Sequence, residues 1–397
     1  MKILISAFQC SPVRGSEPGN GWHWPAALAD CGHDVTVLTQ TEFREEITAA
    51  GRPDINFRFI DLPKSPSALL RTYDGYRRWQ DAAVREAESS PQDYDVIHHV
   101  AWGSLHLGSR LWRLPAPMVY GPIGGGQTAP ANYWRSFGRD WPLEAIRSAS
   151  TGSLLKLNNR TRETVRNSDV VLVTNSATEA ACRRLGAVDV RYFLAEGLPE
   201  DWLVAPRSQP SGVPTVLWVG RMLPRKTPAL AVKAFAQLRR VRPARLVMAG
   251  DGPLRPQVQA TVERLGLTDD VELLGRVPWQ DIKQLYDSAS VFLFTSLRDS
   301  SGAQFLEALG RGLPAVALDH HGIGDVKVGP AAVKVPLPAR PDELPGLLAS
   351  ALQTVLSDGE WESRSAVGVS WAGEHVWSAK AAAATQIYRE IAGRRRR

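Results

Sequence analysis

Two carboxylates in the stretch LRDSSGAQFLEAL (residues 297–309) are spaced to hold one elongated, hydroxylated ligand. Asp299 stands in a polar turn, and Glu307 follows about one turn inside the helix that the apolar pattern predicts. Carboxylates accept hydrogen bonds from sugar hydroxyls. Gly302 lies between them and permits close approach of the backbone, so the amides of residues 302–304 could face a phosphate or sugar oxygen.

Two cations precede this stretch and are spaced to meet a negatively charged group. In VGRMLPRK (residues 219–226), Arg221 and Lys226 follow an apolar run that predicts a strand, and a helical pattern begins at Pro228. Because amides at the start of a helix attract anions, both cations would converge with them on a phosphate. The alternative is a pair of solvated loop cations.

Glycine turns follow the predicted strands of this half of the chain. They are the AGDGP turn at residues 249–253 and the GRV turn at residues 275–277. Turns between strands and helices often need glycine, so each is weak evidence by itself. The acids, cations and amides together favour a site for a nucleotide diphosphate sugar.

Alternating elements must position these residues. In the first half, apolar runs predict strands, and helical patterns lie between them. This alternation predicts a parallel sheet with crossover helices. The strands are predicted at residues 2–8, 34–39, 55–62, 95–100, 117–122 and 170–175, and the helices at residues 22–30, 68–88 and 155–166.

The pattern restarts after VAPRSQPSGVP (residues 204–214), which is rich in Pro and Ser and has no periodicity. The chain therefore predicts two doubly wound α/β domains that face each other. In such sheets ligands bind beyond the carboxyl ends of the strands, where Arg221 and Asp299 lie. The second set of strands is predicted at residues 215–220, 244–250, 270–275, 290–296 and 313–319, with helices at 228–239, 254–265 and 279–288.

Length and composition indicate a soluble enzyme of two domains. A chain of 397 residues exceeds what one core usually supports, and 44% hydrophobic with 22% charged residues is ordinary for such an enzyme. The net charge is +6, and Arg394–Arg397 supply four of these charges. This run predicts a solvated tail, with weak contact to an acidic membrane surface as the alternative. No RNA-binding motif or zinc-ligand spacing accompanies it, so we expect no nucleic-acid partner.

The cysteines and the apolar runs indicate in which cellular compartment the protein is expected. Three scattered cysteines, Cys10, Cys31 and Cys182, predict no disulfide framework. The run MKILISAF predicts a strand and not a signal peptide, and no run approaches the length of a membrane-spanning helix. We expect a soluble, cytoplasmic protein.

In combination, the order G-R-x4-K, G-D-G-P, G-x-V and acid-x7-Glu-Ala resembles the retaining glycosyltransferases of family four over nearly the whole chain. The resemblance implies the GT-B fold, an α/β architecture in which two Rossmann-like, doubly wound domains face a central cleft. It implies that Arg221 and Lys226 hold the donor diphosphate and assist departure of the nucleotide. It further implies that Asp299 contacts the transferred sugar and Glu307 binds ribose. The other donor contacts that it implies are Gly15, Gly220, Gly250, Arg276, Val277, Ser301, Gly302, Ala303 and Gln304.

The amino-terminal half matches the family less closely. RGSEPGNGWHWPAALADCGHDVTVLT (residues 14–39) resembles the family's first glycine loop and the helix after it. There Gly15 would approach the diphosphate and Glu17 would make a polar contact on the acceptor side. A nicotinamide-binding loop is the alternative, but Trp24 stands where its third glycine belongs.

Two positions depart from the family pattern. The first acid is commonly Glu, and Asp299 is one methylene shorter, so the donor sugar could sit differently. Many members also carry a histidine near the position of Ile123, where this chain has a glycine run, Gly124–Gly126. We place Gly124 and Gly125 on the acceptor side. His98 and His99 are the nearest substitutes, predicted as a catalytic residue and an acceptor-side contact, with packing in the core as the alternative.

These patterns and the resemblance predict the domain boundaries. An N-terminal Rossmann-like domain on the acceptor side takes residues 1–204, and residues 205–214 form a linker. A C-terminal Rossmann-like domain on the donor side takes residues 215–370. Residues 371–397 form a helix that crosses back to the first domain, followed by the basic tail.

We therefore expect a retaining, metal-independent glycosyltransferase of the hexosyltransferase type, in carbohydrate or natural-product biosynthesis. Its donor would be a UDP-sugar or, second, a GDP-sugar, its acceptor a hydroxyl compound, and it would need no cofactor. Asp93-x-Asp95 precedes its strand, whereas metal-binding pairs follow one, which argues against a metal site. The alternatives are an NAD-dependent oxidoreductase and a non-catalytic nucleotide-sugar binder.

The acceptor stays open among small natural products, polysaccharide intermediates and lipid-linked sugars. The segment APANYWRSFGRDW (residues 129–141) is aromatic and basic. It either lines the acceptor side or packs in the core.

Overall fold

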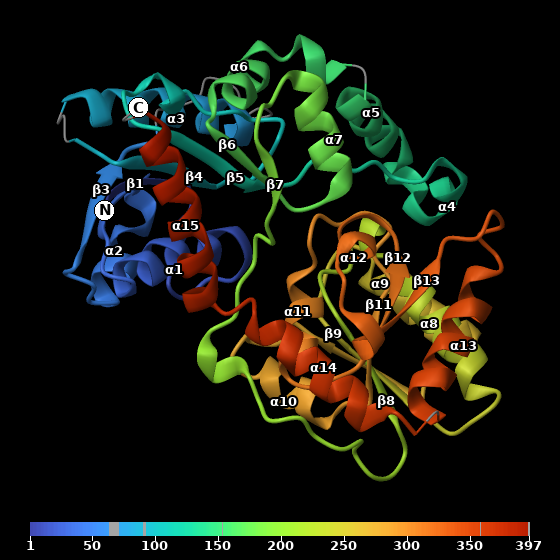
Figure 1. Ribbon diagram of the computed structural model, residues 1–397. Coiled ribbons are helices and arrows are strands. Elements are labelled where there is room, and N and C mark those ends of the chain that lie inside the picture. Colours follow the sequence, from blue (N-terminus) through green and yellow to red (C-terminus); the bar gives the residue numbers. More distant parts are fainter. Residues whose placement is uncertain (63–70, 90–92, 153, 358, 396–397) are drawn as a thin grey trace. The chain divides into compact units, whose positions relative to one another are not determined.

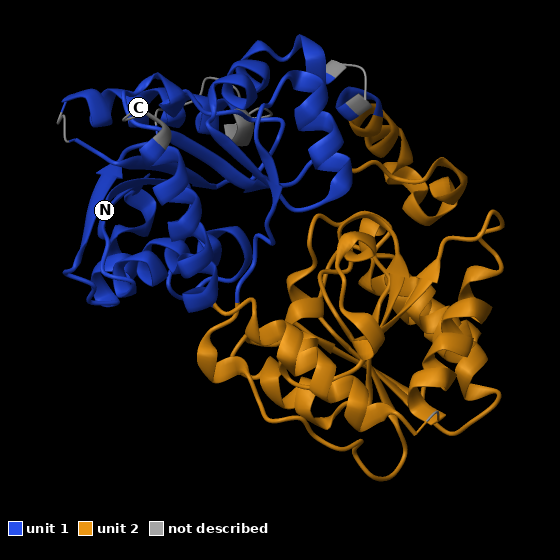
Figure 2. Cartoon of the chain, in the orientation of Figure 1, with its two compact units in different colours: residues 1–126, 149–197, 377–397 blue, residues 127–148, 198–376 orange. Residues whose placement is uncertain are grey.

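The computed structural model describes residues 1–62, 71–89, 93–152, 154–357 and 359–395 (Figure 1). The chain divides into two compact units, which Figure 2 colours separately. Unit 1 comprises residues 1–126, 149–197 and 377–397, and unit 2 comprises residues 127–148 and 198–376.

Unit 1 is built on a parallel sheet of order β3-β2-β1-β4-β5-β6-β7. The sheet is doubly wound, because the chain runs outward from β1 to β3 and then returns to β4 on the other side of β1. The strands are β1 (Lys2–Ala7), β2 (Asp34–Gln40), β3 (Ile55–Ile60), β4 (Val96–Ala101), β5 (Met118–Ile123), β6 (Val170–Val173) and β7 (Val190–Tyr192). The helices include α1 (Ser16–Asp30), α2 (Arg44–Ala49), α3 (Arg71–Ser89), α6 (Asn159–Asn167), α7 (Ser176–Leu185) and α15 (Trp377–Arg395).

Helices cover both faces of the unit 1 sheet. Ile3 and Ile5 of β1 belong to a buried cluster with residues of α1 and α15, which lie side by side in Figure 1. Leu4, between them in sequence, belongs to a second cluster with residues of α3 and α7. Alternate side chains of a strand point to opposite faces, so a strand covered on both faces must be apolar throughout. This explains the continuous apolar run of β1.

Unit 2 has a parallel sheet of order β10-β9-β8-β11-β12-β13. Strand order switches between β8 and β11, so the loops after these two strands open at the same edge. The strands are β8 (Thr215–Val219), β9 (Arg245–Ala249), β10 (Val271–Gly275), β11 (Val291–Phe294), β12 (Ala315–Asp319) and β13 (Ala332–Pro336). The helices are α4 (Trp134–Phe137), α8 (Pro228–Arg239), α9 (Arg255–Arg264), α10 (Ile282–Ser288), α11 (Ala303–Gly310), α12 (His321–Asp325), α13 (Leu344–Ser357) and α14 (Trp361–Gly373); α5 (Trp141–Gly152) begins in unit 2 and ends in unit 1.

The predicted fold class, two Rossmann-like parallel-sheet domains, is confirmed, and each predicted strand forms within two residues of its expected ends. The sequence missed β7 and β13. Both lie at an edge of their sheet and carry polar residues such as Arg191 and Lys334, because an edge strand is not buried on all sides. The helix predicted at 22–30 begins six residues earlier, at Ser16, through a Pro- and Gly-containing stretch that disfavours helix.

The division into units differs from the predicted boundaries at residues 127–148, at residues 198–204 and in the linker. Residues 127–148, predicted in the first domain, belong to unit 2, where Tyr133 Oη donates to the Pro338 carbonyl at 3.0 Å. The predicted linker is also attached to unit 2. The Arg207 guanidinium donates to the carbonyls of Tyr286, Asp287 and Arg311 at 2.6–2.9 Å, which removes the freedom that the Pro- and Ser-rich composition suggested.

The helix predicted within residues 371–397 is interrupted, and its first residues belong to a separate helix. α14 ends at Gly373 in unit 2, and α15 begins at Trp377 and belongs to unit 1, so the chain returns to the first unit as expected. The predicted basic tail lies partly outside the described residues, which end at 395.

Candidate functional site

Lys226 and Asp299 meet where β8 and β11 end. The Lys226 ammonium donates to Asp299 Oδ2, and the Arg225 guanidinium lies 3.5 Å from the same oxygen. The side chains of Lys226 and Asp299 are only 9% and 16% exposed. Burial by itself raises the pKa of Asp299, but Lys226 and Arg225 outweigh it and hold this pKa below its ordinary value. The site therefore keeps a charged acid and two cations in a poorly hydrated place.

Backbone contacts fix the turn after β8 against the end of β11. Thr227 Oγ1 donates to the Thr295 carbonyl at 2.5 Å, and Thr295 Oγ1 donates back to the Lys226 carbonyl at 2.9 Å. The Leu297 amide donates to the Arg225 carbonyl at 2.8 Å. Lys226 and Asp299 are thus held together by main-chain geometry as well as by charge.

Gly302 shapes the start of α11 beside this pair. Its φ is +80°, and a Cβ there would lie 2.9 Å from Ile323 Cδ1 and 3.1 Å from the Phe294 ring. No side chain caps α11, and the Phe305 amide donates to the Gly302 carbonyl at 2.9 Å, so the amides of Ala303 and Gln304 remain for a ligand or water. Gln304 Oε1 lies 3.4 Å from Lys226 Nζ. The structure therefore places the predicted Gly302, Ala303 and Gln304 next to Lys226 and Asp299.

Glu307 lies farther along α11 and is held by aromatic donors. Tyr286 Oη donates to Oε2 at 2.9 Å, and Trp279 Nε1 donates to Oε1 at 3.2 Å. Burial and the Glu307 carboxylate raise the pKa of Tyr286 well above its ordinary value, so the phenol stays a donor. Trp202 stacks on Trp279 with ring centroids 4.7 Å apart. Sequence reasoning missed both donors, although an aromatic pair at seven-residue spacing in the 279–288 pattern could have suggested one helix face.

The predicted glycine turns line a cavity of about 570 Å³ in unit 2. A Cβ on Gly250 would lie 1.9 Å from the Gly220 carbonyl oxygen, and one on Gly252 would lie 2.6 Å from that of Met222, so both positions require glycine. Arg221 is exposed and lines this cavity, whereas Arg225 is the arginine beside Asp299. The lining residues are Val219, Gly220, Arg221, Ala249, Gly250, Asp251, Gly252, Pro253, Arg276, Val277 and Ile282.

Two buried polar atoms near the acid motif have no hydrogen-bond partner. They are Ser301 Oγ and His320 Nε2. Their loops touch, since a Cβ on Gly322 would lie 2.0 Å from the Ser300 carbonyl oxygen. The loops follow β11 and β12, which are neighbours in the sheet. Buried polar atoms are rarely left unsatisfied, so this pair suits a polar ligand. Ser301 was predicted as a donor contact, and His320 was missed.

A buried ion pair supports the residue before Asp299. Arg298 Nε lies 2.7 Å from Glu144 Oε1, and the side chains are 16% and 8% exposed. Burial, with repulsion from Arg147, lowers the pKa of Arg298 to about 10. His321 Nε2 donates to the Thr128 carbonyl, 2.5 Å away. Segment 127–148 is therefore attached to the loops after β11 and β12, a contact that no local pattern could reveal.

The predicted acceptor-side residues gather in unit 1. A Glu17 oxygen accepts from the Gly103 amide at 3.4 Å, and the Gly124 amide donates to the Gly103 carbonyl at 2.9 Å. Burial, opposed by the Gly103 amide and reinforced by Glu196, raises the pKa of Glu17 to about 7. A carboxyl group with such a pKa can bind or release a proton near neutrality.

Three further features of unit 1 concern the residues around this cluster. His106 Nε2 lies 2.9 Å from the Gly125 carbonyl oxygen, a neighbour that the sequence did not suggest. Gly15 stands before the first turn of α1, with no atom within 4 Å of the place of a Cβ. Gly21 is a packing glycine, since a Cβ there would lie 1.8 Å from the Gln9 carbonyl oxygen.

His98 and His99 lie in the core of unit 1, fully buried. His98 Nε2 lies 2.7 Å from the Gly121 carbonyl oxygen, and Tyr388 Oη lies 2.6 Å from Nδ1. His99 contacts Tyr76 Oη and Ser6 Oγ, each at 3.0 Å. Burial lowers the pKa of His98 to about 3 and that of His99 to about 4. With both ring nitrogens engaged, His98 fits the packing alternative and not the predicted catalytic role.

Asp95 serves the start of β4 and not a ligand site. Its Oδ2 accepts from the Lys2 amide at 2.9 Å, at the end of the sheet opposite the glycine loops. Among the residues that the structure describes, no group of three His, Cys, Asp or Glu side chains is arranged to hold a metal ion. None of the described helices combines the length and the apolar character needed to cross a membrane.

Comparison with known proteins assigns each half of the chain to a sequence family. The family described as "Glycosyl transferase 4-like domain" matches residues 22–195. The family described as "Glycosyl transferases group 1" matches residues 204–358. The two matches follow the two Rossmann-like domains.

Individual proteins agree with this assignment. The chain is 26% identical to the D-inositol 3-phosphate glycosyltransferase of Thermobispora bispora, over 91% of this chain and 87% of that one. It is 31% identical to the alpha-D-kanosaminyltransferase of Streptomyces kanamyceticus, but over only 45% of this chain and 46% of the relative.

Solved structures share the fold at low identity. Sucrose-phosphate synthase of Thermosynechococcus elongatus superposes with a TM-score of 0.70 at 19% identity, covering 98% of each chain. The Anabaena protein HepE, solved in complex with UDP, superposes with a TM-score of 0.65 at 16% identity, covering 98% of this chain and 100% of that one.

Proposed function

Because the chain belongs to the family-four glycosyltransferases of the GT-B fold, we propose that it transfers a sugar from a nucleotide diphosphate sugar to a hydroxyl acceptor, with retention of configuration and without a metal ion. The observation that carries the proposal is the buried Lys226–Asp299 pair at the uncapped start of α11. UDP is the favoured nucleotide, since HepE, which shares the fold, is solved with UDP.

The donor diphosphate lies beside the cations at the end of β8 and the start of α11. Lys226 and Arg225 supply cations, and the first-turn amides of α11 supply hydrogen-bond donors. Arg221 reaches the same edge from the glycine-lined cavity. Fixed charges and dipoles of this kind stabilise the negative charge that develops on a departing diphosphate, the task that a divalent cation performs in other enzymes.

The transferred sugar lies beside Asp299. Its hydroxyls donate to this carboxylate, and they also satisfy the unpartnered Ser301 Oγ and His320 Nε2. His320 stands in the loop after β12, which contacts the loop that carries Asp299. His320 is thus a donor contact added to those predicted from the sequence.

The nucleoside lies at the other end of α11. Glu307 accepts from the ribose hydroxyls, while Tyr286 and Trp279 hold the carboxylate in position. The glycine-lined cavity, where Gly250 and Gly252 permit close approach, receives the rest of the nucleotide.

The reaction exchanges one bond at the anomeric carbon. The bond to the diphosphate oxygen breaks as the bond to the acceptor oxygen forms on the same face, and the acceptor's proton passes to a donor phosphate oxygen. This assignment needs no protein base, consistent with the engaged nitrogens of His98.

A direct experiment combines binding with product analysis. Calorimetric titration with UDP and UDP-glucose should show binding of both, and NMR of the anomeric proton should show retention in the product of transfer or of slow donor hydrolysis. Binding of neither UDP- nor GDP-sugars would remove the proposal. A product with inverted anomeric configuration would contradict the proposed retention. Binding without any turnover would favour a non-catalytic nucleotide-sugar binder.

A further inference from the structure

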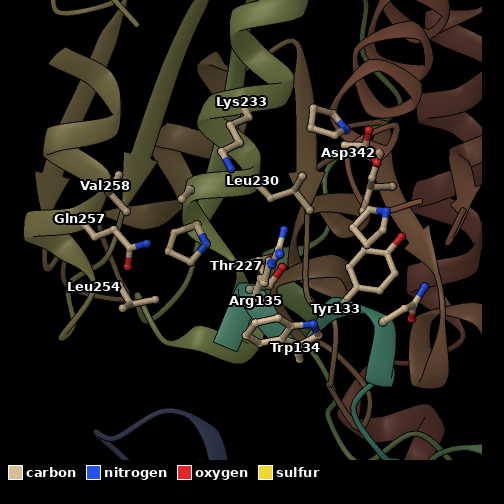
Figure 3. A pocket seen from close by; sticks show the side chains of 17 residues that line it. Tyr133, Trp134, Arg135, Thr227, Leu230, Lys233, Leu254, Gln257, Val258 and Asp342 are labelled. Carbon is tan, nitrogen blue, oxygen red and sulfur yellow. The ribbon is translucent and has the colours of Figure 1, made fainter. Parts of the chain in front are cut away.

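Unit 2 contains a second and larger cavity, of about 790 Å³, outside the site described above (Figure 3). Its walls come from the first turns of α8, from α9, from the start of α13 and from the segment that contains α4. None of its lining residues belongs to the glycine-lined cavity. The volume is within the range of pockets that bind small molecules.

This cavity adjoins the proposed reaction site through a single turn. Lys226 contacts Asp299, and the next residue, Thr227, lines the cavity together with Pro228. The wall of the cavity therefore includes the residue next to Lys226 in the chain. This fits part of a reactant better than an unrelated regulator.

Trp134 is held at the cavity in an exposed position. Its neighbours fasten the segment to unit 2, since Tyr133 Oη donates to the Pro338 carbonyl at 3.0 Å and Asn132 Nδ2 donates to the Ala339 carbonyl at 3.2 Å. Phe137 is buried, yet the Trp134 side chain stays 48% exposed and lines the cavity. A large apolar ring kept partly in water beside a cavity indicates a ligand surface more than a core residue.

The other lining side chains supply hydrogen-bonding groups of both kinds. Lys233 donates, Asp342 accepts and Gln257 does both; Figure 3 shows all three around the cavity, with Trp134 at its lower edge. A phosphate-only site fits less well, because Asp342 is present and α8 begins with Pro228, which lacks an amide hydrogen. An aromatic face combined with donors and acceptors matches a sugar ring, which has an apolar C–H face and polar hydroxyl edges.

We propose that this cavity, the Trp134 pocket, binds a saccharide unit of the acceptor, with the sugar ring stacked on Trp134 and its hydroxyls bonded to Lys233, Gln257 and Asp342. The word acceptor rests on the proposed function; binding of a saccharide here does not. The proposal narrows the acceptors left open by the sequence to those that carry a sugar, such as polysaccharide intermediates and glycosides.

The test uses the full chain and neutral disaccharides (sucrose, maltose, cellobiose and lactose) as probes at millimolar concentration. Saturation-transfer NMR should show contact with at least one of them, and it should be lost in Trp134→Ala, with Kd raised about tenfold or more. Trp134→Phe should retain part of the binding, because it keeps an aromatic ring. Leu143→Ala is the matched control, since Leu143 is 71% exposed on the same segment and does not line the pocket.

Titration with UDP separates a failure here from a failure of the proposed function. Trp134→Ala should bind UDP as the wild type does, which also shows that unit 2 is folded. Absence of binding by all four disaccharides, or binding that survives Trp134→Ala unchanged, would overturn the Trp134 pocket whether or not UDP binds. If the wild type bound a disaccharide but did not bind UDP, the proposed donor site would be wrong and the Trp134 pocket would stand.

Discussion

At the scale of single residues, the proposed chemistry depends on buried charges that need an opposite charge beside them. Asp299 is buried against Lys226 and Arg225, and their attraction outweighs a burial that favours the neutral acid. Removing one member of such a pair leaves an uncompensated charge, which costs more than the contact itself contributes. Substitutions here therefore test both catalysis and local order.

We expect Lys226→Ala to lower turnover by about 10² or more. The substitution removes the Lys226 ammonium, one of the fixed positive charges that would stabilise the departing diphosphate. Steady-state kinetics with the sugar nucleotide measure the effect. Lys327→Ala is the control, since Lys327 is an exposed lysine of unit 2 outside both cavities. Near wild-type turnover in Lys226→Ala would contradict the phosphate assignment.

The two acids of α11 and its preceding turn should divide the donor between them. Glu307→Ala is expected to weaken binding of free UDP as well as of the sugar nucleotide, because Glu307 accepts from ribose in the proposed donor site. Asp299→Ala should spare UDP and weaken the sugar nucleotide or its turnover. A hydrogen bond to a charged group is worth roughly 1.5–3 kcal/mol, about a tenfold to hundredfold effect. Calorimetry with both ligands checks the division, and wild-type binding by both variants would show that the acids are structural.

At the scale of elements, α5 acts as a support for the loop after β11. Glu144 of α5 pairs with Arg298, and both side chains are largely buried. A helix that lies far from the acid motif in sequence thus holds the residue adjacent to Asp299. This arrangement predicts a stability effect at a position with no direct contact to a ligand.

Glu144→Gln should destabilise the protein by about 3–5 kcal/mol, because it leaves the Arg298 charge buried and uncompensated. Chemical denaturation measures this change, and the double variant Glu144→Leu, Arg298→Met should recover most of it. Equal destabilisation of the single and double variants would mean that volume, and not charge, dominates at this position.

The docking of α15 on unit 1 should depend on pH through Lys380. Its ammonium donates to the Leu194 carbonyl and lies 4.5 Å from the Phe193 ring centre, with the residue 2% exposed. Burial, partly opposed by Glu196, lowers the pKa of Lys380 from 10.5 to about 7. Between these pH values the unfolded chain binds the extra proton, so the free energy of unfolding should rise with pH, by at most about 1.4 kcal/mol per unit.

Lys380→Met removes this titration, and its unfolding free energy should lack that rise relative to the wild type. Denaturant unfolding at pH 7, 8 and 9 measures both proteins. Parallel pH profiles for the two would show that Lys380 keeps an ordinary pKa.

At the scale of the whole molecule, one sheet switch point in unit 2 collects the charges that the proposed reaction needs. Lys226 and Arg225 follow β8, and Asp299 follows the neighbouring β11. Loops from strands that are distant in sequence but adjacent in the sheet converge in this way. The arrangement provides fixed positive charge at this edge of the sheet.

We therefore expect transfer activity to survive excess EDTA. In the proposed mechanism, the fixed cations and the α11 amides perform the electrostatic task of a divalent ion. Activity assays with and without chelator provide the measurement. Complete loss with EDTA that magnesium or manganese restores would refute the metal-free mechanism.

The sequence by itself determined the fold class, the strand-end positions of Arg221, Lys226 and Asp299, the helical position of Glu307, and the glycine turns. These features are local, because periodicity and turn chemistry act over a few residues. A strand that is covered on both faces must be apolar, so its run is visible without any neighbour.

Only the tertiary structure decided which of these residues meet and what completes the site. It placed Arg225, and not Arg221, beside Asp299, and it buried His98 against Tyr388 of α15. It brought His320 next to the acid motif. Such contacts join residues tens to hundreds of positions apart, and burial then fixes their charge states. No periodic pattern encodes them, since they depend on strand order and helix docking.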